Sequence, residues 1–155
     1  MKPIELQIGY WVCYSKPNGY VTRVDDIRRY GDESIGYEYA ISCKRDERDP
    51  LYEKAPVDSF NVEIIHPIPL TPEILKMNGF YEDRPGITYR YRKFGETTID
   101  VIDVFFHSNG KVTATINGMT NDVYCNYVHC YCGHVHELQH AMRLCRIDKE
   151  IELED

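Results

Sequence analysis

The chain lacks any long run of apolar residues. A helix that spans a bilayer needs roughly 18 consecutive, mostly apolar residues, and no segment of this 155-residue sequence approaches that length. Residues 1–7 also lack the continuous apolar core of a secretory signal. We therefore expect a cytoplasmic protein with no membrane partner. In that compartment the six cysteines should be reduced, as buried thiols or metal ligands rather than disulfides.

Positive charge is also scarce. The chain has 18 Lys and Arg residues against 25 Asp and Glu residues, a formal net charge of −7 at pH 7. Such a chain repels DNA and RNA overall, so we expect no nucleic-acid partner. With 43% hydrophobic and 28% charged residues, the composition is that of a folded protein. The 13 tyrosines favour β-structure and surfaces that meet ligands or partners.

The first half of the sequence has the pattern of short strands joined by polar loops. Alternating apolar residues predict strands over residues 6–14, 20–24, 35–43 and 60–65, with Asn18 and Gly19 in a turn and a polar loop between 24 and 35. Cys13 and Cys43 fall in these strands and are expected in the core. Four or five short strands in about 65 residues predict a small SH3-like β-barrel for residues 1–68.

A second domain is predicted over residues 69–155. Pro67 and Pro69 hold the chain extended and oppose strand pairing, which marks the boundary. A short linker helix follows, because Thr71 is suited to the N-cap, Pro72 to the first helical position, and Asn78-Gly79 to the helix end.

The rest of the second domain is predicted to be an antiparallel sheet with a C-terminal packing helix. Strands are expected over residues 87–92, 97–107, 111–117 and 123–132, and Asn109-Gly110 is the strongest hairpin signal. The period changes to helical from about residue 133 to about residue 145. Residues 148–155 form either a final short strand or a frayed end. The predicted fold class is therefore α+β.

One motif names a chemistry: His136, Glu137 and His140 form an H-E-x-x-H. Two histidines four residues apart share a helix face and can both bind zinc, while the glutamate acts on the metal-bound water. A zinc-dependent hydrolase of the metallopeptidase type, with Glu137 as its catalytic residue, is therefore one hypothesis.

The lack of an evident third zinc ligand argues against that hypothesis. Arg143 and Arg146 stand where the extended motif needs a glycine and a third histidine, and only 15 residues follow His140, too few for another well-packed helix. An upstream ligand such as His107, His129 or Cys132 stays open, although its spacing follows no known pattern.

The phase of the helix gives the alternative interpretation. Apolar side chains form one arc, which we expect to pack on the sheet: Val135, Leu138, Ala141, Met142 and Cys145. His136 and His140, together with Gln139 and Arg143, are then predicted to point outward as a solvated or partner-contacting face. We favour this interpretation over a metal site, so no cofactor is expected and zinc is the alternative.

Cys130, Cys132 and His134 lie just before this helix and raise the question of a second metal site. A C-x-C pair is a poorer chelate than the C-x₂₋₄-C knuckle of structural zinc, and no second cysteine pair completes four ligands. We favour buried thiols.

The strand of residues 89–92 offers a candidate ligand-binding site. It places Arg90 and Arg92 on one face and Tyr89 and Tyr91 on the other. Arginines beside aromatic residues suit phosphates and carboxylates. The alternative is a half-buried strand with its tyrosines in the core and its arginines in water. The P-loop, G-x-G-x-x-G and G-x-S-x-G motifs are all missing.

Several short stretches, taken in order, resemble one family. They are L-Q-I-G at residues 6–9, P-I-P-L-T-P-E-I-L at 67–75, N-G-F at 78–80 and V-H-E-L-Q-H-A at 135–141. This pattern resembles small uncharacterised proteins encoded by phages and prophages of gut anaerobic bacteria. The resemblance spans nearly the whole chain but implies no catalytic residues.

The resemblance implies a small phage accessory protein. Proteins of that kind often counteract host defence by binding a host protein or by sequestering a signalling nucleotide. We therefore favour a non-enzymatic binding protein whose partner is a host protein or a small anionic ligand, over the zinc hydrolase. The sequence is also compatible with a homo-oligomer.

Overall fold

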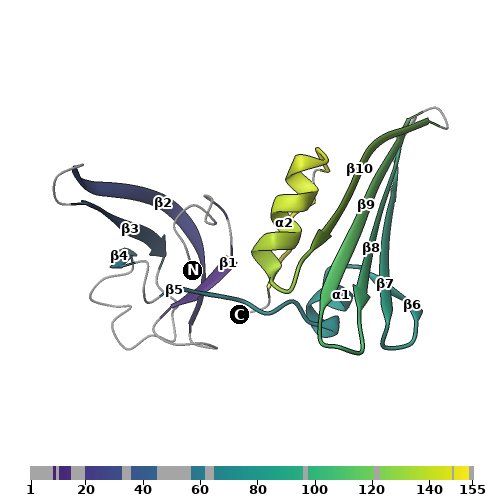
Figure 1. Cartoon of the computed structure of the whole chain (residues 1–155), viewed down its shortest axis with the longest axis horizontal. Coiled ribbons are helices and arrows are strands. Elements are labelled where there is room, and N and C mark those ends of the chain that lie inside the picture. The colour runs from purple at the N-terminus through teal and green to yellow at the C-terminus, as the bar shows by residue number, and fades with distance from the viewer. Residues whose placement is uncertain are drawn as a thin grey trace. The chain divides into compact units, whose positions relative to one another are not determined.

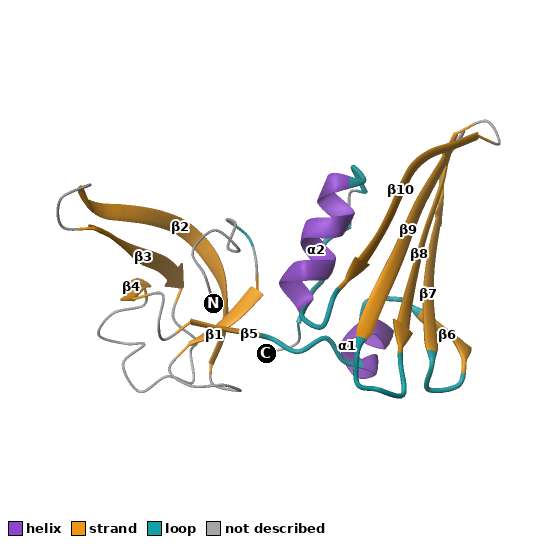
Figure 2. Cartoon of the chain, viewed as in Figure 1, coloured by secondary structure: helices purple, strands orange, loops and turns teal. Residues whose placement is uncertain are grey.

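A computed structural model of the chain describes residues 9, 11–14, 20–32, 36–44, 57–61, 65–95, 98–120, 123–147 and 149–153. The chain divides into two compact units, Met1–Ile68 and Pro69–Asp155. Each contains one antiparallel sheet, and the helices belong to the second (Figures 1 and 2). The α+β class is confirmed. Neither helix of the described residues has the length and apolar character needed to cross a membrane.

The first unit is a five-stranded antiparallel sheet in the order β4-β3-β2-β1-β5. Its strands are β1 (Trp11–Tyr14), β2 (Tyr20–Asp32), β3 (Gly36–Lys44), β4 (Val57–Asn61) and β5 (Ile65–Pro67). The described pairings leave β4 and β5 as the two ends of the sheet, so they do not close a barrel. The SH3-like barrel is therefore not confirmed by these pairings.

The length of β2 corrects one prediction. The polar residues after Val24 were expected in a loop, but the strand continues to Asp32 and pairs with β3. The register shifts between Val24 and Asp26, which marks a β-bulge. Asp26 and Arg28 form an ion pair at 2.7 Å on this exposed stretch. A polar segment can extend a hairpin because backbone hydrogen bonds, rather than apolar side chains, hold its strands together.

The strand predicted over residues 60–65 is in fact two strands at opposite ends of the sheet. β4 pairs with β3, whereas β5 pairs with β1. Pro67 was expected to oppose strand pairing, but it lies in β5 opposite Val12 of β1. Proline is tolerated at a sheet edge, where its missing N–H is not needed for a ladder bond.

Both predicted core cysteines of this unit are buried, at 2% exposure for Cys13 and 0% for Cys43. Cys43 packs in a cluster with Val12, Tyr14, Val24, Ile41 and Ile65. Burial is the main cause that raises the pKa of the Cys43 thiol to about 12, with a smaller contribution from the nearby charge of Asp25. This thiol is therefore a core group rather than a nucleophile.

The second unit is a five-stranded sheet in the order β10-β9-β8-β7-β6 with two helices. In chain order its elements are α1 (Pro72–Met77), β6 (Tyr81–Arg84), β7 (Thr88–Phe94), β8 (Thr98–Phe106), β9 (Val112–Thr120), β10 (Val123–Tyr131) and α2 (Val135–Leu144). β7 to β10 and both helices were predicted, whereas β6 was missed because it has four residues, all exposed, and no apolar alternation.

Local signals place α1 and the β8–β9 hairpin as predicted. The Thr71 hydroxyl accepts a hydrogen bond from the backbone N–H of Ile74 at 3.4 Å, and Pro72 is the first helical residue. Gly79 has a φ of +78°, the left-handed conformation that favours glycine after a helix. In the hairpin, Gly110 also has a φ of +78°.

The sheet of the second unit has two different faces. One face carries fully buried Ile102, Val104, Ala114 and Ile116, and α2 packs against β9 and β10 on this side (Figure 1). The other face carries alternate residues of the same strands, and the elements described for this unit do not include a helix that covers it. We call it the open face.

Candidate functional site

The glutamate of the H-E-x-x-H caps α2. The backbone N–H of His134, the residue before the helix, donates a hydrogen bond to Glu137 Oε2 at 3.0 Å. The same oxygen lies 3.2 Å from His134 Nδ1. A glutamate at the third helical position that reaches back to the N-cap is the second half of a capping box. Glu137 thus has a structural role that needs no metal.

The two histidines of the motif lie in different environments. His140 is exposed, whereas His136 is only 6% exposed and its ring stacks on that of His134 with centroids 5.7 Å apart. Gln139 is also buried, at 2%. The outward, solvated face predicted for α2 is therefore wrong for His136 and Gln139. Helical phase infers the buried side from apolar residues alone, so it cannot detect polar side chains that are buried.

Among the residues that the structure describes, no group of three His, Cys, Asp or Glu side chains could hold a metal ion. His136 and His140 therefore have no third protein ligand there, and a catalytic zinc generally uses three.

The cysteines around α2 are thiols in the core. Cys132 is 0% exposed and Cys145 is 5% exposed, while Cys130 is half-buried, and none of the three is in a disulfide. Burial raises the pKa of all three thiols. Protonated thiols are poor nucleophiles.

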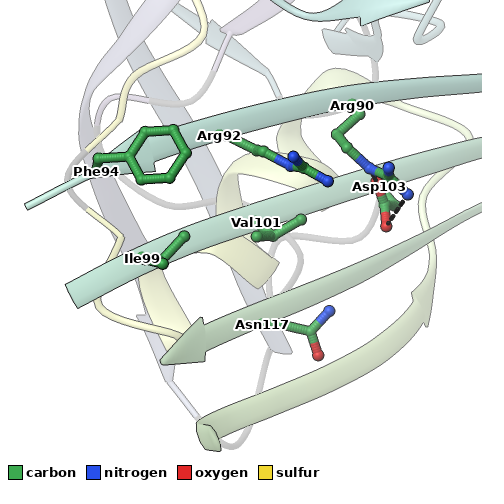
Figure 3. Close-up of a pocket in the computed structure, with 7 residues that line it drawn as sticks. All are labelled: Arg90, Arg92, Phe94, Ile99, Val101, Asp103 and Asn117. Carbon is green, nitrogen blue, oxygen red and sulfur yellow. Dashed lines mark hydrogen bonds and ion pairs between the residues drawn. The ribbon is translucent and has the colours of Figure 1, made fainter. Parts of the chain in front are cut away.

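A shallow pocket lies on the open face of the second unit (Figure 3). Its volume is about 350 Å³, near the lower end of the range for small-molecule sites. Three strands supply its lining: Arg90, Arg92 and Phe94 from β7, Ile99, Val101 and Asp103 from β8, and Asn117 from β9. The strand register brings them together, because Arg92 is opposite Val101 and Val101 is opposite Asn117.

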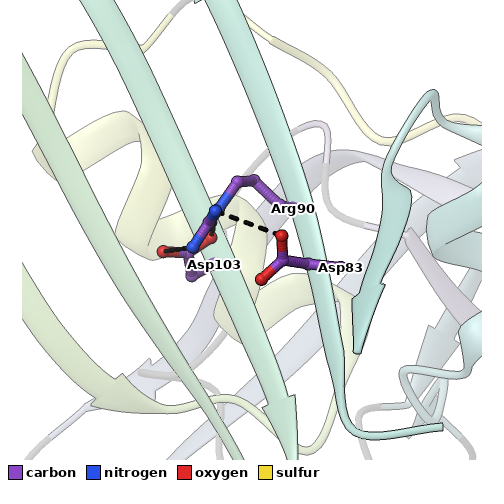
Figure 4. Close-up of polar contacts among 3 residues, drawn as sticks. All are labelled: Asp83, Arg90 and Asp103. Atoms are coloured by element: carbon purple, nitrogen blue, oxygen red, sulfur yellow. Dashed lines mark hydrogen bonds and ion pairs between the residues drawn. The ribbon is translucent and has the colours of Figure 1, made fainter. Parts of the chain in front are cut away.

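Arg90 is held by two carboxylates (Figure 4). Its Nε and a terminal nitrogen donate to the two oxygens of Asp103 at 2.5 and 3.2 Å, and its other terminal nitrogen lies 3.2 Å from Asp83. The hydrogen bonds to Asp103 are the largest cause of the raised pKa of Arg90. The sequence singled out Arg90 as an anion ligand, but its charge is already neutralised within the protein.

Arg92 differs from Arg90. Its side chain is exposed, and within the described part of the chain no carboxylate forms an ion pair with it. It shares the pocket with the amide of Asn117 and with Phe94, whose ring is 70% exposed. The pocket therefore combines one available cation, one amide and one aromatic surface.

Tyr89 and Tyr91 do not line this pocket. Tyr89 is 2% exposed and its ring meets that of Phe106 edge-on at 5.5 Å. Tyr91 packs against Phe80 at 5.4 Å between ring centroids, and the ammonium of Lys149 lies 4.6 Å from its ring centre. Both tyrosines are on the face that the helices cover, as the half-buried-strand alternative states.

Sequence reasoning missed Asp103, Asn117 and the apolar lining of the pocket. A two-residue loop at Asn109-Gly110 would have placed Val101 opposite Gly118. The loop has three residues, 108–110, and Val101 pairs with Asn117 instead, so the local signal predicted the hairpin but not its register. The pairing of Arg90 with Asp103 depends on the β7–β8 register. Residues 95–97 contain one turn residue, Gly95, which does not by itself set the loop length or the register.

Comparisons with known proteins do not identify the chain. No protein-family model, no curated protein and no solved structure matches it significantly. The likeness to phage-encoded proteins therefore stays a prediction.

Proposed function

We propose that this is a non-enzymatic binding protein, and that the pocket around Arg92 holds a small anionic ligand of the nucleotide class. The observation that carries the proposal is an exposed guanidinium without a carboxylate partner among the described residues, beside an amide and an exposed aromatic ring. Arginine binds phosphate through a planar fork of donors. Phe94 offers a stacking surface for a base, and Asn117 offers donors and an acceptor for its edge.

Asp103 and Arg90 form an ion pair within the pocket lining. The pairing with Arg90 reduces the negative charge that Asp103 presents to the ligand, although Arg90 is shared with Asp83. The ion pair joins β7 and β8 at the register pair Arg90–Asp103, two residues from the pair Arg92–Val101. A preformed site loses less conformational freedom on binding.

A thermal-stability screen tests the proposal. Nucleoside monophosphates, nucleoside triphosphates, cyclic dinucleotides and inorganic phosphate should be tested separately, because a ligand that binds only the folded state raises the melting temperature. Arg92→Ala should weaken binding by about tenfold or more, since a charge-assisted hydrogen bond is lost.

Lys93→Ala is the matched control. It removes the same charge one residue away, from a side chain that is absent from the pocket lining, and it should leave binding unchanged. If no member of the panel stabilises the protein, or if Lys93→Ala weakens binding as much as Arg92→Ala, the pocket is not the site.

The resemblance to phage-encoded proteins gives this binding a context. We propose a cytoplasmic accessory protein that sequesters a host signalling nucleotide and so counteracts defence. Binding to a host protein is the alternative use of the open face. Analogy, rather than residue geometry, supports this role.

For the first unit we propose a small SH3-like barrel. Residues 20–23 of β2 pair with β1, and residues 24–32 pair with β3, with a bulge where the partner changes. A strand that bends at a bulge and contributes to two sheets is how small barrels turn a corner. NMR distance contacts between β4 and β5 in the full chain would test closure.

A further inference from the structure

The two edges of the second unit's sheet differ in how they are protected. β6 forms one edge and has four residues, three of which are charged: Glu82, Asp83 and Arg84. All four are exposed, and the pairing of β6 with β7 is interrupted by a register shift between Glu82 and Arg84. Short length, charge and irregular pairing are the features that block strand addition at an edge.

The other edge, β10, is neither short nor charged, and its own register shift lies near its start, between Tyr124 and Asn126. It has nine residues, V-Y-C-N-Y-V-H-C-Y, with no Asp, Glu, Lys, Arg or Pro. Its described hydrogen-bonded partner strand is β9 alone. A long, uncharged edge strand is a template for pairing with another strand.

Backbone geometry shows which groups of β10 face outward. The N–H of Cys132 donates to the carbonyl of Val112 at 3.1 Å. Because hydrogen-bonded pairs alternate along an antiparallel ladder, Cys130 and Val128 also direct their N–H and C=O groups toward β9. The N–H and C=O groups of His129 and Tyr131 then point away from the sheet.

We propose that β10 pairs antiparallel with β10 of a second copy of this chain, across a two-fold axis perpendicular to the sheet. An antiparallel edge is complementary to itself, since the axis brings each outward N–H opposite an outward C=O. Although each chain has a net charge of −7, the absence of charged residues in β10 keeps like charges out of the paired strands.

A second copy fits this edge better than a head-to-tail array does. Head-to-tail pairing would place β10 against β6, whose charges and irregular pairing oppose it. Pairing of β10 with β10 uses the uncharged edge of the second unit's sheet in each copy and closes as a dimer. The two open faces then lie on the same side of one continuous sheet.

A proline at residue 129 tests this interface. His129→Pro removes an N–H that points outward, so the ladder to β9 keeps its hydrogen bonds. His129→Thr is the matched control, because it also removes the imidazole and its 3.1 Å contact with Thr115 but retains the N–H. Two-fold symmetry doubles the loss in His129→Pro, so we expect the dimer dissociation constant to rise by about tenfold to a hundredfold.

The measurement is light scattering after size-exclusion chromatography, over a series of protein concentrations. Wild-type protein and His129→Thr should approach twice the mass of one 18.2 kDa chain, and His129→Pro should remain near one chain. Circular dichroism shows whether each variant is folded. If His129→Pro does not fold, Tyr131→Pro serves as a second edge variant. Wild-type protein that is monomeric up to the millimolar range overturns the proposal, as does a folded proline variant that still dimerises.

Discussion

The side-chain amide of Asn78 and the backbone of Glu152 form two hydrogen bonds, each 2.7 Å long. The amide nitrogen donates to the carbonyl of Glu152, and the amide oxygen accepts from its N–H. Asn78 is the residue that ends α1 and is 7% exposed. One side chain therefore ends a helix and fixes the C-terminal segment, whose Ile151 is fully buried.

Asn78→Ala should destabilise the protein by about 1–3 kcal/mol, because the two hydrogen bonds to Glu152 and a third to the Ile74 carbonyl are lost, and the Glu152 backbone groups lose their partner. Urea denaturation measures the change. Glu152→Ala is the control, because it keeps both backbone groups. It should lower the free energy of unfolding by less than Asn78→Ala does. An equal loss of stability in both variants would show that the Asn78 side chain does not hold the C-terminal segment.

Glu137 should matter for stability and not for metal binding. Glu137→Ala should lower the free energy of unfolding by about 0.5–2 kcal/mol, because the cap of α2 is lost. Glu137→Gln retains an acceptor for the His134 N–H and should lower it by less. Chemical denaturation separates the two variants.

Metal analysis of the purified protein tests whether His136 and His140 bind zinc. We expect less than one zinc per chain. About one zinc per chain, lost in the His136→Ala/His140→Ala double variant, would restore the hydrolase hypothesis.

Stability at acidic pH should depend on Glu82. The N–H of Gly86 (2.6 Å), then the Tyr89 hydroxyl (3.1 Å) and Lys76 (3.3 Å) hold the pKa of this carboxyl below its ordinary value of 4.5. A carboxyl whose pKa is lower in the folded state stabilises the protein above the unfolded-state pKa, and loses that effect as pH falls through the folded-state value.

The difference in stability between wild type and Glu82→Gln should therefore shrink as the pH falls from about 5 to about 3. Urea midpoints measured across that range give the result. A difference that stays constant with pH would mean that the Glu82 carboxylate is not engaged in these contacts.

The parts of the fold that were predictable from sequence are those fixed by neighbouring residues. Thr71, Pro72 and Gly79 define α1, and Asn109-Gly110 defines the β8–β9 hairpin, because caps and turns depend on local backbone conformation. Arg90 and Arg92 were assigned to one face by strand alternation alone.

The remaining parts depend on contacts between distant residues. Whether Arg90 is free depends on Asp103, 13 residues further along the chain, and no local pattern gives that pairing. The burial of His136 depends on what surrounds α2. The extension of β2 to Asp32 depends on the available partner β3 rather than on the apolar pattern of its own sequence.

Chemical-shift mapping by NMR tests the central proposal most directly. Adenosine and guanosine monophosphates should be titrated into isotope-labelled full-length protein while the backbone amide signals are followed. We predict saturable shifts concentrated around Arg92, Val101 and Asn117, which disappear in Arg92→Ala and persist in Lys93→Ala. Shifts confined to α2 around His136 and His140, or no saturable shifts at all, would contradict a ligand pocket on the open face.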